Sequence, residues 1–114
     1  MIIDFNEITH EILLNFKGGE GELHTRNFID DKCKIMMSCL APGASSGYHK
    51  HEGNCEIVYI IDGQGYFCYD GVNEPFTKGD VHYCPMGHSH SMHNNSEDDI
   101  IYLAIVPEHS CKDL

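Results

Sequence analysis

Short segments in which apolar and polar residues alternate, each bounded by turn residues, run through most of this chain. The segment 22–29 alternates loosely, whereas 100–106 is apolar enough to be buried on both faces of a sheet. Further strands are expected over 33–40, 56–61, 66–69, 81–84 and around His90. Turn pairs such as Asp62-Gly63 and Asp70-Gly71 separate these segments. The pattern predicts about eight to ten short strands, no long helix, and an all-β sandwich or barrel.

The N-terminal residues 1–20 depart from this pattern, because an apolar start is followed by a helix-like stretch over 7–16. We expect them to form a strand, or an arm that lies on a partner subunit. At the other end, Pro107 is expected to end the last strand and the tail to residue 114 to be mobile. The 114 residues contain neither a linker nor an internal repeat, so 1–114 is predicted to be a single domain.

Three side chains that can bind metal ions fall close together, at His49, His51 and Glu56. Residues two apart share a face on a strand but not on a helix, so the two histidines predict an extended segment. The turn residues Gly53-Asn54 interrupt the alternation, which allows Glu56 to rejoin the histidine side. A second segment further along the chain contains His90 on another strand. The two segments must fold face to face for the four side chains to meet.

Both segments contain fixed residues at regular spacings. The first has Gly43, His49-Lys50-His51, Glu56 and Gly63, and the second has Gly79, Pro85-Met86-Gly87, His90 and Asn94. In these residues the chain resembles the cupin superfamily, which has two such motifs. The resemblance implies a small single-domain cupin, with a double-stranded β-helix (jelly-roll) barrel and a metal-binding core over about 40–107. It also implies one divalent metal ion, bound by His49, His51, Glu56 and His90.

Three imidazoles and one carboxylate suit a divalent transition metal such as Mn, Fe, Co, Ni or Zn. If the four donors occupy one side of an octahedron, two adjacent positions stay open for water or for a bidentate ligand. Purely structural metal sites are more often tetrahedral and rich in thiolates. The ligand set therefore predicts an open site that can bind or activate a small molecule.

Four further residues are candidates for contacts with a substrate. Similarity with small cupins implies that Tyr102 and Met92 lie near the open metal positions, in a largely apolar and aromatic pocket. Arg26 is the only arginine, and a guanidinium can pair with a substrate carboxylate. The pattern of 22–29 leaves open whether Arg26 points inward or into solvent. His88 shares a strand face with His90, which predicts a place at the rim of the pocket.

Composition narrows the range of partners. The net charge of −11, with 7 basic against 18 acidic residues, argues against nucleic acid and anionic membranes as partners. No apolar run is long enough to cross a membrane, and a cytoplasmic protein is expected. The six cysteines include no CxxC pair and are expected to be free thiols. Apolar residues on both faces of 57–61 favour a homodimer.

The sequence is compatible with two functions, and the full set of metal ligands disfavours a third. The first is a metal-dependent enzyme, such as a dioxygenase or an isomerase, with a small polar metabolite as substrate. The alternative is a non-catalytic module that binds or senses a small molecule through the metal. The third is a structural cupin without a ligand. Oxalate decarboxylation is disfavoured because no acidic lid accompanies the motifs, and because such enzymes resemble two fused domains.

Overall fold

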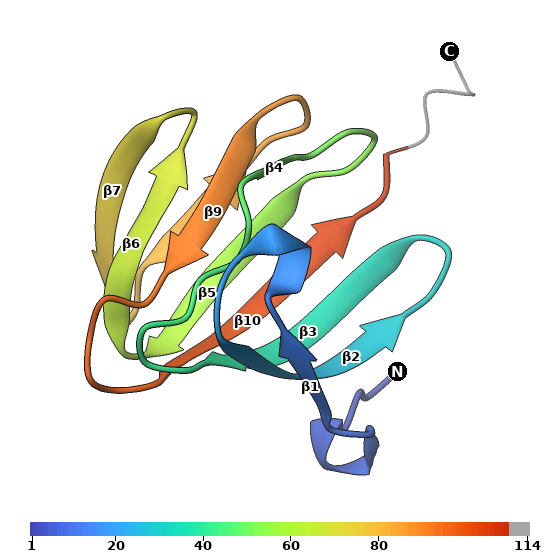
Figure 1. Ribbon diagram of the computed structural model, residues 1–114. Coiled ribbons are helices and arrows are strands. Elements are labelled where there is room, and N and C mark those ends of the chain that lie inside the picture. The colour runs from blue at the N-terminus through green and yellow to red at the C-terminus, as the bar shows by residue number, and fades with distance from the viewer. Residues whose placement is uncertain (110–114) are drawn as a thin grey trace.

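The fold consists almost entirely of strands, which confirms the predicted all-β class (Figure 1). This computed structural model describes residues 1–109, so most of the tail that we expected to be mobile lies outside the described residues. The elements in chain order are η1 (Phe5–Glu7), β1 (Glu11–Leu14), η2 (Phe16–Gly18), β2 (Glu22–Ile29), β3 (Cys33–Leu40), β4 (His49–Lys50), β5 (Glu56–Asp62), β6 (Gln64–Tyr69), β7 (Val72–Thr77), β8 (Val81–Cys84), β9 (Ser89–His93) and β10 (Ile100–Pro107).

The strands form two antiparallel sheets that face each other across the core, as in a jelly-roll barrel (Figure 1). The larger sheet has the order β1-β2-β3-β10-β5-β8, and the smaller has the order β4-β9-β6-β7. Strand β10 lies between β3 and β5, so the last strand of the chain joins two segments that are distant in sequence. Such long-range pairing requires the chain to fold back on itself.

The core lies between the two sheets and is built from alternate positions of each strand. On β5, Val58 and Ile60 are buried, and on β10 Ile100 and Ala104 are fully buried. The intervening residues point outward. Ile101 is 37% exposed, which corrects the expectation that the strand over 100–106 is buried on both faces. The outer face of the larger sheet is therefore apolar but open to solvent in a single chain.

The N-terminal residues lie on the sheet of their own chain, not in a helix over 7–16. Strand β1 pairs antiparallel with β2, and a short 3-10 helix stands on either side of β1. Arg26 binds the N-terminal residues: its Nη1 donates hydrogen bonds to the carbonyl oxygens of Phe5 (3.1 Å) and Ile8 (2.8 Å). After β1 the chain returns to the barrel, where Phe16 and Lys17 line the internal cavity.

Two expectations from composition can be compared with the described residues. Among residues 1–109, no helix is long and apolar enough to span a membrane. Five cysteines are free thiols, as expected: Cys33, Cys39, Cys55, Cys68 and Cys84. The sixth cysteine of the sequence, Cys111, lies outside the described residues.

Gly47 allows η2 to pack closely against the loop before β4. A Cβ atom at Gly47 would lie only 1.7 Å from the carbonyl oxygen of Lys17, so no side chain fits there. The Gly47 amide also donates a hydrogen bond to the carbonyl oxygen of Phe16, at 2.9 Å. This contact holds the arm at the cavity.

We expect Gly47→Ala to lower the free energy of unfolding by more than about 2 kcal/mol, because backbone atoms must move to admit the methyl group. Gly71→Ala is the control: its φ of +82° is unfavourable for alanine, but no atom lies within 4 Å of the added Cβ. That conformational penalty is about 1–2 kcal/mol. Chemical denaturation measures both variants, and an equal or smaller loss for Gly47→Ala would contradict the close packing.

Candidate metal centre

The candidate metal ligands come from three strands that the fold brings together. Strand β4 pairs antiparallel with β9, and this register places His49 directly opposite His90. His51 follows β4, and its main chain is held at both ends. Its amide donates to the His88 carbonyl oxygen at 2.9 Å, and its carbonyl oxygen accepts from the Gly87 amide at 2.7 Å. Glu56 is the first residue of β5, after the predicted turn.

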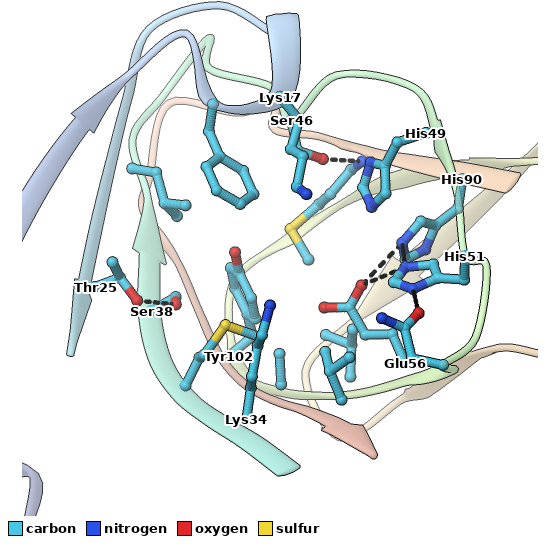
Figure 2. Close-up of a pocket in the computed structure, with 18 of the residues that line it drawn as sticks. Lys17, Thr25, Lys34, Ser38, Ser46, His49, His51, Glu56, His90 and Tyr102 are labelled. Atoms are coloured by element: carbon cyan, nitrogen blue, oxygen red, sulfur yellow. Dashed lines mark hydrogen bonds and ion pairs between the residues drawn. The ribbon is translucent and has the colours of Figure 1, made fainter. Parts of the chain in front are cut away.

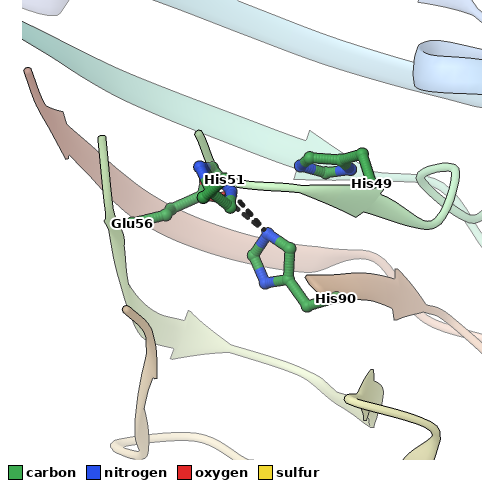
Figure 3. A group of neighbouring side chains, drawn as sticks. All are labelled: His49, His51, Glu56 and His90. Atoms are coloured by element: carbon green, nitrogen blue, oxygen red, sulfur yellow. Dashed lines mark hydrogen bonds and ion pairs between the residues drawn. The ribbon is translucent and has the colours of Figure 1, made fainter. Parts of the chain in front are cut away.

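The four side chains converge on one point (Figure 3). One donor atom from each of His49, His51, Glu56 and His90 lies within 4.8 Å of the other three. Glu56 Oε1 is 3.2 Å from His51 Nε2 and 2.9 Å from His90 Nε2. The two Nε2 atoms are themselves 2.9 Å apart. The predicted ligand set is therefore assembled in a geometry that could hold a metal ion.

Each of the three histidines is held from behind through its Nδ1 atom. His49 Nδ1 donates to the Gly47 carbonyl oxygen at 2.7 Å, and His51 Nδ1 donates to Asn54 Oδ1 at 2.6 Å. His90 Nδ1 lies 2.9 Å from His82 Nε2. A neutral imidazole has one N–H, so a hydrogen on Nδ1 leaves the Nε2 lone pair free to bind a metal. The outer hydrogen bonds thus turn three lone pairs toward the same point.

The chemistry of this donor set suits a divalent cation. Two imidazole lone pairs and a carboxylate oxygen face each other at hydrogen-bond distance, and all three are acceptors when the Nδ1 atoms carry the hydrogens. Such a group needs positive charge, supplied by protons or by a metal. Imidazole and carboxylate ligands suit first-row transition metals, with His49, His51, Glu56 and His90 as the residues that would hold one.

The electrostatics of the centre favour charged Glu56 and neutral His49. Burial alone would raise the pKa of Glu56, but without a metal ion the His51 and His90 rings can carry hydrogens on Nε2 as well, and their hydrogen bonds to Glu56 lower its pKa to about 2. Burial lowers the pKa of His49, and the hydrogen bond to Gly47 offsets only part of this shift. The hydrogen bond to Glu56 raises the pKa of His51. Glu56 is therefore ionised at neutral pH, as a metal ligand must be.

His82 contacts the donor cluster behind His90, a position that the sequence pattern did not indicate. It is 8% exposed, and its ring stacks on Phe67 with centroids 3.7 Å apart. Burial, with the nearby His90, lowers its pKa to about 4, so it is neutral and can accept the hydrogen on His90 Nδ1. Alternation with the exposed Val81 and Tyr83 on β8 was the one signal that pointed inward.

A cavity of about 220 Å³ extends from the donor cluster into the barrel (Figure 2). Tyr102 and Met92, two of the predicted substrate contacts, are among the residues that line it. Phe16, Met36, Val58 and Phe67 supply apolar surface, but the wall also contains hydroxyl, amide and ammonium groups. The cavity is thus less uniformly apolar than the sequence predicted.

Positive charge is concentrated around this cavity. The lining includes Lys17, Lys34 and Lys50, which are three of the 7 basic residues of the chain. Among residues 1–109, Glu52 and Glu56 are the only acidic residues that belong to it. On a chain of net charge −11, this distribution favours an anionic ligand.

Two of the predicted substrate contacts lie elsewhere. Arg26 points to the outer face of β2 and binds the N-terminal arm, so its guanidinium does not reach the cavity. His88 belongs to the turn before β9 and is outside the cavity lining. Its Nδ1 lies 2.5 Å from Asp70 Oδ2, and the side chain is 45% exposed. Of the lysines that line the cavity, Lys50 is paired with Glu52 at 3.8 Å and is 55% exposed, so Lys17 and Lys34 are the cations that a ligand could meet.

The fold and the four converging donors define a small cupin with a candidate metal centre. The profile of the family described as Cupin domain matches residues 36–106, and the chain belongs to this family. A relative from Thermotoga maritima, named an oxalate-binding protein, is 37% identical over 112 residues, which cover 93% of each chain.

Solved structures support the same fold. The crystal structure of a predicted oxalate decarboxylase from Thermotoga maritima matches with a TM-score of 0.88 and 36% identity, covering 95% of this chain and 99% of that one. A sugar phosphate isomerase of the cupin superfamily from Silicibacter pomeroyi has a TM-score of 0.78 at 18% identity. It covers 95% of this chain and 76% of its own, and at this identity it shows the fold alone.

Removing the acceptor behind His90 should weaken metal binding. We expect His82→Leu to lower the affinity for Mn²⁺ by about 10- to 100-fold, the range typical of hydrogen bonds behind a metal ligand. His82→Gln keeps an acceptor oxygen and should recover part of the loss. His24→Leu, on the outer side of β2, is the control. Competition with a chromophoric chelator measures the affinity, and a wild-type value for His82→Leu would rule out this positioning role.

Proposed function

We propose that this protein binds a small dicarboxylate of the oxalate class, through one divalent transition-metal ion held by His49, His51, Glu56 and His90. The observation that carries the proposal is the convergence of these four donors at one end of a cavity lined with lysines. A bound ion would offer oxygen ligands the coordination positions that the protein leaves free. The name of the 37% identical relative, an oxalate-binding protein, supports the same ligand class.

The size and charge of the cavity support a small dianion. Pockets for drug-sized ligands usually measure about 300–1,000 Å³, whereas this cavity measures about 220 Å³. A dicarboxylate presents two oxygens that can occupy adjacent coordination positions, and its charge suits the neighbouring lysines. Mn, Fe, Co, Ni and Zn all remain compatible with the donor set.

The residues around the cavity favour binding over turnover. A decarboxylase or isomerase needs an acid or base beside the reacting atoms, with a pKa close to the working pH. Of the two carboxylates at the cavity, Glu56 belongs to the proposed ligand set and Glu52 is mostly exposed. Burial raises the pKa of Tyr102, which makes it a poor proton donor for catalysis. We therefore favour a binding module over the isomerase, and the free thiols support a cytoplasmic location.

Calorimetry with oxalate tests this function directly. We expect one oxalate to bind per chain after loading with Mn²⁺, and no binding to the metal-free protein. His90→Ala should abolish both metal and oxalate binding, whereas His24→Ala should leave both unchanged. Formate and carbonate are assayed in the same samples. Release of either product would favour the enzymatic alternative, and oxalate binding that needs no metal would refute the proposal.

We also propose a homodimer formed through the outer face of the larger sheet. Exposed apolar side chains gather there: Tyr59 (45%), Val81 (62%), Tyr83 (55%) and Ile101 (37%). Strands β5 and β8 pair so that Tyr59 stands opposite Val81. Contiguous apolar patches of this kind are uncommon on monomers and often mark interfaces between subunits.

Light scattering should give the mass of a dimer for the wild-type chain. Val81→Glu should produce monomers, because a carboxylate would be buried without a partner in the interface. Val72→Glu is a matched control, since Val72 is also 62% exposed but lies on β7 of the other sheet. A monomeric wild type, or equal behaviour of the two variants, would exclude this interface.

A further inference from the structure

A row of buried polar side chains crosses the wall of the cavity that faces the metal centre. Thr25 on β2, Ser38 on β3 and Tyr102 on β10 stand opposite one another in the strand registers. All three are at least nine-tenths buried and line the cavity. Figure 2 shows Thr25, Ser38, Tyr102 and Lys34 on one side of the pocket, with the histidines and Glu56 on the other. Buried polar groups in such a wall call for partners.

The hydrogens of two of these hydroxyl groups are already used. Thr25 Oγ1 donates its single hydrogen to Asn27 Oδ1, at 2.5 Å. The 2.8 Å contact between Thr25 and Ser38 must then use the hydrogen of Ser38. Both hydroxyls therefore donate in one direction, toward Asn27. They orient the Asn27 amide and have no hydrogen left for a ligand.

The groups that remain available on this wall are donors. Because its oxygen accepts from Thr25, Asn27 has its NH₂ group free to donate, and within residues 1–109 this group makes no side-chain hydrogen bond. Burial raises the pKa of Tyr102, so its phenol keeps its hydrogen at neutral pH. The Tyr102 hydroxyl points into the pocket in Figure 2. Lys34 adds an ammonium group, which can only donate.

The strand register places Lys34 of this wall in the same row as Glu56 of the candidate metal centre. Lys34 pairs with Val106 on β10, and Ile57 of β5 pairs with the neighbouring Ile105. Continuing this register sets Glu56 beside Val106, so Lys34 and Glu56 share one row, two strand spacings apart. That separation is about 10 Å between their backbones, which the side chains narrow from both sides.

We propose that Asn27, Lys34 and Tyr102 form a donor wall that binds the outward-facing oxygens of a metal-bound dicarboxylate. The inference rests on the proposed function, and it adds the residues that would distinguish one ligand from another. A dicarboxylate that binds the ion through one oxygen of each carboxylate has its two other oxygens directed away from the ion. Those oxygens accept hydrogen bonds, and each of the three residues has an N–H or O–H group that can donate one. An amide NH₂ group of a ligand at this position would face the Asn27 NH₂ and Lys34 ammonium groups, which cannot accept a hydrogen bond from it.

Oxalate and oxamate provide the test, because they have nearly the same shape but oxamate has one amide in place of a carboxylate. The ratio of their dissociation constants is measured by calorimetry on the Mn²⁺-loaded protein. We expect Lys34→Gln and Tyr102→Phe each to reduce the preference for oxalate by on the order of tenfold, as for the loss of a hydrogen bond to a charged group. Metal affinity should stay unchanged in both variants.

Two control variants separate the wall from general effects of charge and stability. Lys32→Gln makes the same change of charge at an exposed turn outside the cavity, and Tyr66→Phe removes a phenol that does not line it. Both should keep the wild-type preference. If oxalate binds and the preference is unchanged in Lys34→Gln and Tyr102→Phe, the donor wall is refuted while the proposed function stands. If metal-loaded wild type binds neither acid, the proposed function fails and the donor wall with it.

Discussion

The metal centre depends on three hydrogen bonds behind the histidine rings. A histidine side chain can rotate and can exist in two tautomers, so residue identity alone does not make it a ligand. Here the Gly47 carbonyl oxygen, the Asn54 side chain and His82 each engage one Nδ1 atom. These bonds orient the Nε2 lone pairs toward Glu56. Each of the three partners comes from a different part of the fold, so the four donors can meet only when both sheets are correctly assembled.

The sequence predicted the fold class and the four donors because those depend on local spacing and on motif residues. Arg26 and His88 were predicted to contact a substrate but do not line the cavity, because their positions depend on strand registers and turns. Arg26 lies on the face of β2 opposite to Leu23 and Thr25, where it contacts the N-terminal arm. Only the pairing of β2 with β3 decides that Leu23 and Thr25 face inward. His88 sits in the turn before β9, where strand alternation does not apply. His82 was missed because its contact with His90 spans two sheets.

The chain is acidic overall, but the cavity is lined with lysines, so the two act on an anionic ligand in opposite directions. With a net charge of −11, the chain as a whole repels a dianion at long range. Salt screens this repulsion over about 8–10 Å, whereas contacts inside the cavity are less screened. For the proposed ligand, Lys17 and Lys34 at the cavity together with a bound divalent ion would therefore outweigh acidic residues on distant surfaces. The same repulsion acts on every other anion. Anions that are too bulky to enter the cavity make none of the contacts inside it, so nothing there offsets the repulsion.

Fold similarity and site chemistry carry different weight in assigning a function. The isomerase of 18% identity shares the barrel, but cupin barrels support many reactions, so its activity has no bearing on this chain. The oxalate-binding relative is similar along nearly its full length, yet its name would mean little without suitable residues here. Those residues are a buried, ionised carboxylate among three oriented imidazoles, opposite a wall of donors. An anion with acceptors on both sides would satisfy a metal ion at the four donors and the proposed donor wall together, whereas a neutral ligand would leave the charge of Lys34 without a counterion in the cavity.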